Sequence, residues 1–175
     1  MHPDLTPPQP DPVPLDSPPP PARWTPLLLL ATGLGAGYSP ILPGTCGALW
    51  GLPLTWLLLA LPARWEQAAA MVALAAVGPW ICGAASRALG QKDPSAVVYD
   101  EIASVPLVFL PLAPDALEKP AVWVCGFLLI RVLDIVKPPP VGQLEKLPGG
   151  LGIMADDLAA GAMAGLGMWL AQRWL

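Results

Sequence analysis

Residues 149–161 have the sequence GGLGIMADDLAAG, in which the adjacent carboxylates Asp156 and Asp157 stand between a glycine-rich turn and a run of small apolar residues. This run predicts a final helix from about Leu158 to Leu175. Two neighbouring like charges beside an apolar helix are costly unless a positive charge balances them. The pair therefore indicates either acids that stabilise the first turn of a helix or ligands of a metal ion, and we favour the metal.

The composition of the chain is typical of a membrane protein. Of its 175 residues, 54% are hydrophobic and 13% are charged, whereas soluble domains carry about 25% charged residues. The 40 residues between Arg23 and Arg64 carry no charge, and this run is about twice as long as one helix needs to cross a bilayer. The net charge of −4 gives no support to nucleic-acid binding.

The first 23 residues are mostly proline and carry almost no large apolar side chain, so residues 1–23 are predicted to be a disordered tail. Residues 24–175 are predicted to form a single helical domain. The three cysteines, Cys46, Cys82 and Cys125, are widely spaced, and the only histidine lies in the tail. This pattern indicates neither a disulfide framework nor a zinc site.

The domain divides into apolar segments separated by glycine, proline and charged residues. We predict an all-α fold, a small polytopic helical membrane bundle with short or interrupted helices. The expected segments are a short helix over 24–31, an irregular loop over 33–47, a helix capped by Thr45 and ending near Leu61, a helix over 67–89, an apolar segment over 102–113 broken by two prolines, a helix over 121–136, and the final helix, in which Gly161 and Gly165 favour close packing.

If these segments cross the membrane in alternation, four irregular or charged stretches fall on the same side. They are the glycine-rich loop after residue 33, Asp100-Glu101, the segment 131–137, and Asp156-Asp157. Six of the nine lysines and arginines accompany them. By the positive-inside tendency, this side of the membrane is predicted to be cytoplasmic.

Charged residues recur along the end of the 121–137 segment at Arg131, Asp134 and Lys137, on one face of a helix. A structural ion pair between Arg131 and Asp134 would account for two of them, and Lys137 could simply extend toward the interface. The alternative is that the guanidinium and the ammonium bind a phosphate. Cys125 and Arg131 have the C-x5-R spacing of cysteine phosphatases, but in a helix they lie about 240° apart, so we reject a cysteine nucleophile.

The remaining chemistry is that of acids combined with arginine and lysine, which suits Mg²⁺-assisted chemistry on a phosphate ester. The predicted metal ligands are Asp100, Glu101, Asp156 and Asp157; these four and Asp134 are the predicted catalytic acids; and Thr45, Arg131 and Lys137 are the predicted substrate-binding residues. Attack on the phosphate by water and attack by an aspartate both remain open.

Five motifs together resemble those of the phosphatidylglycerophosphatase A family, over the chain from about Gly33 to Leu175. The motifs are Gly33-x-Gly35, Ser39-Pro-x-x-Pro43-Gly44-Thr45-x-Gly47, Val97-Val-Tyr-Asp-Glu101, Arg131-x-x-Asp134-x-x-Lys137-Pro138, and Gly149-Gly-x-Gly-Ile-Met-x-Asp156-Asp157-x-x-Ala160-Gly161. The chain departs from the usual family pattern at residues 102–104, Ile-Ala-Ser, and at Ile130, where phenylalanine is common.

This resemblance implies an Mg²⁺-dependent enzyme of the bacterial inner (cytoplasmic) membrane with an all-helical fold. The implied reaction removes the terminal phosphate from phosphatidylglycerophosphate and leaves phosphatidylglycerol. The expected partners are a phospholipid substrate and the membrane, whereas the oligomeric state is left open. Two other functions remain possible on the residues alone: a transferase of lipid phosphates, and a non-catalytic membrane protein that binds anionic lipid.

Overall fold

The structure, a computed structural model, describes residues 25–174, and the predicted disordered tail over residues 1–23 lies outside this range. Residues 25–174 form helices and turns without any strand, so the predicted all-α fold is confirmed. In chain order the elements are α1 (Pro26–Ala31), the short 3-10 helix η1 (Ala36–Tyr38), α2 (Pro43–Leu59), α3 (Arg64–Leu89), α4 (Tyr99–Ser104), α5 (Pro106–Phe109), α6 (Pro114–Leu117), α7 (Pro120–Val136), α8 (Val141–Leu144) and α9 (Gly150–Ala171).

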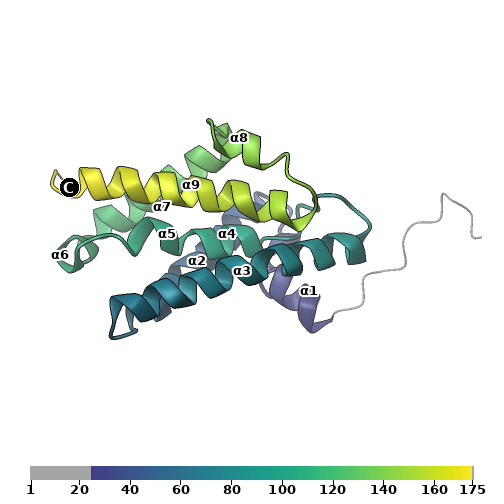
Figure 1. Cartoon of the computed structure of the whole chain (residues 1–175), viewed down its shortest axis with the longest axis horizontal. Coiled ribbons are helices and arrows are strands. Elements are labelled where there is room, and N and C mark those ends of the chain that lie inside the picture. Colours follow the sequence, from purple (N-terminus) through teal and green to yellow (C-terminus); the bar gives the residue numbers. More distant parts are fainter. Residues whose placement is uncertain (1–24, 175) are drawn as a thin grey trace, which may run out of the picture.

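The two longest helices, α3 and α9, lie side by side along the length of the molecule (Figure 1). The short helices α4 and α5 pack against both α9 and α2, and α4 also contacts α3. Their side chains belong to the core, because Val105, Val108 and Phe109 are completely buried. Helix α4 is therefore central, and this position brings its first residues, Asp100 and Glu101, inside the bundle.

Helix α9 begins at Gly150, eight residues before the predicted start, so the placement of Asp156 and Asp157 in a first turn was wrong. The preceding residue, Gly149, has a φ of 59° and ends the turn before the helix. A β-carbon at Gly150 would overlap the carbonyl of Pro79, so the start of α9 packs its backbone directly on α3. This tertiary packing outweighs the low helix propensity of the glycines.

Small residues let α9 approach the centre of the bundle, as predicted. A β-carbon on Gly161 would lie 2.6 Å from the carbonyl oxygen of Ser104, and one on Gly165 would overlap the carbonyl of Leu107. Real β-carbons do not come this close to backbone atoms, so only glycine fits at either position. The prediction of close helix packing through Gly161 and Gly165 is confirmed, and the partner is the α4–α5 segment.

Helix α2 begins at Pro43, and its N-cap is Leu42 in the left-handed conformation with a φ of 50°. Proline is favoured at the first position of a helix, because its fixed φ suits the helix and its missing N–H is not needed there. Thr45 therefore lies within the first turn, and its prediction as the capping residue was wrong. The end of the helix at Leu59 is close to the predicted end.

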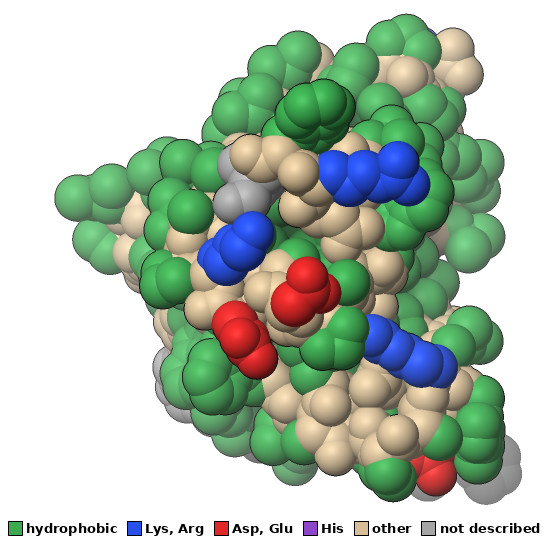
Figure 2. All heavy atoms as spheres, turned by 90° about the vertical axis from the view of Figure 1, so that its left-hand side faces the viewer, with side chains coloured by type: hydrophobic (Ala, Val, Ile, Leu, Met, Phe, Trp, Pro, Cys, Tyr) green, Lys and Arg blue, Asp and Glu red, His purple; other side chains and the backbone are tan. Residues whose placement is uncertain are grey.

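At the end of the bundle where α9 finishes, Arg64 connects the start of α3 to the segment after α5. This residue begins α3, three residues before the predicted start, and the helix is capped by Glu66, which accepts a hydrogen bond from the Ala63 amide at 3.3 Å. The Arg64 guanidinium donates to the carbonyls of Leu110 and Leu112 at 2.9 and 3.2 Å. Figure 2 looks onto this end, where a few charged side chains stand among hydrophobic ones.

The surface of the bundle is strongly apolar. Among the described residues, α3 and α9 are the two helices that are long and apolar enough to cross a membrane. The exposed large side chains include several tryptophans, which favour the interface between lipid and water: Trp50, Trp56, Trp65, Trp80, Trp169 and Trp174. These features indicate a membrane protein.

Candidate active site

A cavity of about 320 Å³ lies at the other end of the bundle, where α4 and α9 begin. It is also lined by residues of the α3–α4 loop, by residues at the end of α7, and by residues of the segment between α8 and α9. Its lining carries seven carboxylates but two ammonium groups: Asp93, Asp100, Glu101, Asp134, Glu145, Asp156 and Asp157, with Lys92 and Lys137. Five of these seven acids are buried or partly buried, and such an excess of acids favours binding of a cation.

Three of these acids converge. Asp100, Glu101 and Asp157 each offer one carboxylate oxygen, and the three oxygens lie within 4.8 Å of one another. The first two come from the start of α4, and the third is the eighth residue of α9. We call these residues the acidic cluster. It joins two sequence motifs that are more than fifty residues apart, so the predicted convergence of these motifs is present in the structure.

Burial makes the acidic cluster costly without a cation. Asp100 is 7% exposed and Asp157 is 6% exposed. Asp100 Oδ1 and Glu101 Oε2 are buried and have no hydrogen-bond partner in the described part of the chain. Burial, and then the charges of Glu101 and Asp157, raise the pKa of Asp100 well above its usual range. Hard carboxylate oxygens in this arrangement match the ligands that Mg²⁺ and Ca²⁺ prefer.

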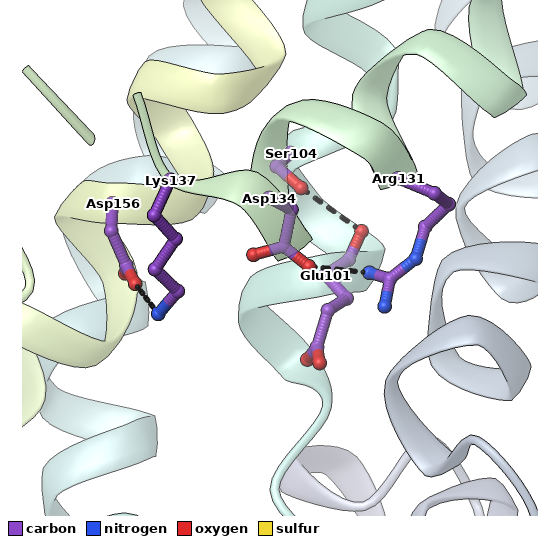
Figure 3. Close-up of polar contacts among 6 residues, drawn as sticks. All are labelled: Glu101, Ser104, Arg131, Asp134, Lys137 and Asp156. Carbon is purple, nitrogen blue, oxygen red and sulfur yellow. Dashed lines mark hydrogen bonds and ion pairs between the residues drawn. The ribbon is translucent and has the colours of Figure 1, made fainter. Parts of the chain in front are cut away.

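Asp156 points to a different partner than its neighbour Asp157. Its Oδ2 accepts a hydrogen bond from Lys137 Nζ at 2.8 Å (Figure 3), while its Oδ1 is buried without a partner among the described residues. Consecutive residues of a helix are turned by about 100° from each other, so the two side chains cannot face the same point. The structure therefore separates Asp156 from the acidic cluster, although the sequence grouped the two as metal ligands.

Lys137 connects the end of α7 to α8 and α9. Besides Asp156, its Nζ contacts Glu145 Oε1 at 3.0 Å. Burial alone would lower the pKa of Lys137, but the hydrogen bonds and charges of Asp156 and Glu145 outweigh it, and the pKa is raised. Lys137 is therefore a fixed positive charge at the edge of the cavity.

Arg131 and Asp134 form the ion pair that the helix spacing predicts, with Nη1 and Oδ2 2.9 Å apart. Figure 3 shows the pair on α7, beside Glu101 of α4. Burial raises the pKa of Glu101, and the charge of Arg131 acts in the opposite direction. Asp134 lines the cavity, whereas Arg131 is not among the residues that line it. The structure thus supports a structural contribution of Arg131, and phosphate binding by this residue stays a prediction.

The first turn of α2 closes the other side of Glu101. A β-carbon on Gly44 would overlap Glu101 Oε1 and would lie 3.1 Å from a terminal nitrogen of Arg131. The glycine motif therefore lets α2 pack against the carboxylate. Thr45, in the same turn, is partly buried and is not among the side chains that line the cavity. Its contact with phosphate stays a prediction.

Three charged cavity residues were not selected from the sequence: Lys92, Asp93 and Glu145. All three lie in short polar turns, where charged residues are common, and nothing in their spacing marks them. Their position becomes evident only from the fold, because the α3–α4 loop and the turn after α8 both border the cavity. Ser104, which stands in a segment that departs from the family pattern, donates to the Glu101 carbonyl at 3.1 Å.

Comparison with known proteins identifies the family of this chain. The family model of phosphatidylglycerophosphatase A matches residues 29–172. The chain is 34% identical to phosphatidylglycerophosphatase A of Escherichia coli over 150 residues, which cover 83% of this chain and 84% of the relative. It is 32% identical to the Haemophilus influenzae protein of the same name, with 86% and 91% covered.

A third relative carries a different name. A Bacteroides thetaiotaomicron protein, provisionally named phosphatidylinositol-3-phosphatase, is 37% identical over 155 residues, which cover 85% of this chain and 94% of the relative. No solved structure gives a significant match to the chain. The family match spans α1 to α9 and includes every residue of the acidic cluster. The resemblance noted in the sequence motifs is therefore confirmed, and the chain belongs to the phosphatidylglycerophosphatase A family.

Proposed function

We propose that this protein removes the terminal phosphate from phosphatidylglycerophosphate in an Mg²⁺-dependent reaction. Family membership supports a lipid phosphatase, a hydrolase that acts on a phosphomonoester. The acidic cluster of Asp100, Glu101 and Asp157 is the single observation that carries the metal assignment. Its oxygen ligands and its unpartnered buried atoms fit a hard divalent cation.

Hydrolysis forms a bond between phosphorus and the oxygen of water, and it breaks the bond between phosphorus and the glycerol oxygen. The water loses a proton, and the glycerol oxygen takes up a proton to leave as a hydroxyl group. Mg²⁺, when bound to the acidic cluster, supplies positive charge that neutralises the phosphate oxygens. Asp156 is held by Lys137 through one oxygen, so its free Oδ1 can accept a hydrogen bond from the attacking water. Lys137 adds positive charge beside the phosphate as negative charge develops in the transition state.

We also propose that the protein lies in the bacterial inner membrane, with the cavity facing the cytoplasm. The distribution of positive side chains supports this orientation. Lys92 and Lys137 line the cavity, and Arg87 lies in the last turn of α3 at the same end. At the opposite end lie Arg64, which donates to the carbonyls of Leu110 and Leu112, Lys119 before α7 and Arg173 after α9.

The proposal is tested with the purified full chain in detergent micelles that contain phosphatidylglycerophosphate. We expect free phosphate and phosphatidylglycerol in equal amounts, a loss of at least about 100-fold with EDTA, and recovery on addition of Mg²⁺. Product analysis by thin-layer chromatography separates the alternatives. A transferase would move phosphate to an acceptor without releasing it, and full activity in EDTA would contradict the metal assignment.

Phosphatidylinositol 3-phosphate is the second substrate to examine, because the Bacteroides relative carries that activity in its name. Both lipids present a terminal phosphomonoester, so the same acids could act on either. The ratio of kcat/KM between the two lipids decides which is the substrate. We expect a higher kcat/KM for phosphatidylglycerophosphate. A higher kcat/KM for the inositol lipid would make that lipid the substrate, and the reaction would still be hydrolysis of a phosphomonoester.

A further inference from the structure

The positive charges of the cavity differ in how they are engaged. Among the described residues of its lining, Lys92 and Lys137 are the two cations. Lys137 is occupied by Asp156 and Glu145 at 2.8 and 3.0 Å. Lys92 is exposed and forms no ion pair with any described residue. Lys92 is therefore the cation of this lining that remains available to a ligand.

The backbone that carries Lys92 is held in place. Ser86, in the last turns of α3, donates its hydroxyl to the carbonyls of Gln91 and Lys92 at 2.5 and 2.9 Å. The Gln91 amide in turn donates to the Ser86 carbonyl, and the Val98 amide at the other end of the loop donates to Ala31. The loop thus fixes the origin of the side chain at the cavity, while the ammonium can move toward a ligand.

The substrate of the proposed function has two phosphates with different needs, and the inference rests on that function. The terminal phosphomonoester belongs with the acidic cluster and its cation. The phosphodiester, which links the headgroup to diacylglycerol, keeps its negative charge during the reaction. A cavity of about 320 Å³ is large enough for a small ligand and not only for one phosphate group. The phosphodiester therefore enters a lining rich in acids, where it requires a positive charge.

We infer that Lys92 binds the phosphodiester of the headgroup and so selects lipids that carry a phosphodiester as well as a terminal phosphomonoester. Phosphatidic acid, which has a terminal phosphomonoester only, offers nothing to this lysine. Phosphatidylglycerophosphate and phosphatidylinositol 3-phosphate share the required chemistry. A strongly hydrated, flexible ammonium suits a single charge that is presented at the mouth of a cavity.

The test measures the kinetics of Lys92→Ala, Lys92→Arg and the matched control Lys146→Ala. Lys146 is also an exposed lysine without an ion pair, but it does not line the cavity. The substrate is whichever of phosphatidylglycerophosphate and phosphatidylinositol 3-phosphate the wild type hydrolyses. For this lipid, Lys92→Ala should raise KM about tenfold, as expected for the loss of one charge-assisted hydrogen bond. The value of kcat should stay within about twofold, and Lys92→Arg should retain most of the affinity.

Phosphatidic acid serves as a competitive inhibitor, and its inhibition constant should be the same for the wild type and Lys92→Ala. An unchanged KM in Lys92→Ala, with an active wild type, overturns this inference and leaves the proposed function standing. If Lys92→Ala and Lys146→Ala both lost equal affinity for the substrate and for phosphatidic acid, the inference would be overturned in favour of general attraction to the membrane surface. A wild type without activity on either phosphatidylglycerophosphate or phosphatidylinositol 3-phosphate overturns both the inference and the proposed function.

Discussion

Replacing Asp157 by asparagine should lower the rate of phosphate release by at least about 10³-fold, because the loss of a charged metal ligand removes several kcal/mol of transition-state stabilisation. Asparagine keeps the size of the side chain, and its neighbours Asp100 and Glu101 remain in place. The rate is measured as free phosphate from phosphatidylglycerophosphate at saturating Mg²⁺. Retained turnover would contradict the assignment of Asp157 to the acidic cluster.

The same variant should be more stable than the wild type when EDTA is present. The three acids of the cluster repel one another, and one carboxylate fewer relieves both this repulsion and the cost of burial. Addition of Mg²⁺ should then raise the Tm of the wild type more than that of the variant, because only the intact cluster binds the ion tightly. The control is Asp115→Asn, an exposed acid of α6 at the other end of the bundle, which should change neither property.

Replacing Lys137 by methionine should reduce kcat by about 10- to 100-fold, the range found when a residue that orients a catalytic ligand is lost. Methionine removes the ammonium that holds Asp156 Oδ2 and leaves a buried carboxylate without its partner. The Lys137 side chain is 30% exposed, so water can replace part of this contact. We therefore expect the free energy of unfolding to fall by about 2 kcal/mol, which is below the range of about 3 to 5 kcal/mol for a fully buried pair that loses one partner.

A double variant separates the two effects of Lys137. Combining Lys137→Met with Asp156→Asn removes both charges, and this should restore most of the stability while activity stays low. Lys119→Met is the matched control, because Lys119 is an exposed lysine that precedes α7 at the far end. If Lys137→Met proved as stable and as active as the wild type, the contact with Asp156 would have neither a structural nor a catalytic role.

The sequence predicted the fold class and the convergence of the acidic motifs. The glycine, proline and charged residues divide the chain into apolar segments, and their alternation brings Asp100 and Asp157 to the same end of the bundle. The ion pair of Arg131 and Asp134 follows from their spacing on one helix. These features follow from the helical spacing of residues and from the order of apolar segments along the chain. Both patterns can be recognised in the sequence without tertiary structure.

Helix starts and the division of roles among the acids depend on tertiary contacts and could not be predicted in this way. Packing on Pro79 lets the glycines at the start of α9 become helical, and this makes Asp156 and Asp157 the seventh and eighth residues of the helix. The partner of Asp156 is Lys137, which follows the last residue of α7 and has a left-handed backbone conformation with a φ of 49°. Neither the contact nor this backbone conformation has a signature in the sequence.

Titration of Mg²⁺ into the purified protein, followed by calorimetry, tests the central claim most directly. The claim is that Asp100, Glu101 and Asp157 hold the divalent ion. We predict saturable binding to the wild type and an affinity at least about tenfold weaker for Asp100→Asn. Asp93→Asn, which alters an acid of the same cavity outside the cluster, should bind Mg²⁺ nearly as the wild type does. Equal Mg²⁺ affinity in the wild type and in Asp100→Asn would contradict the account.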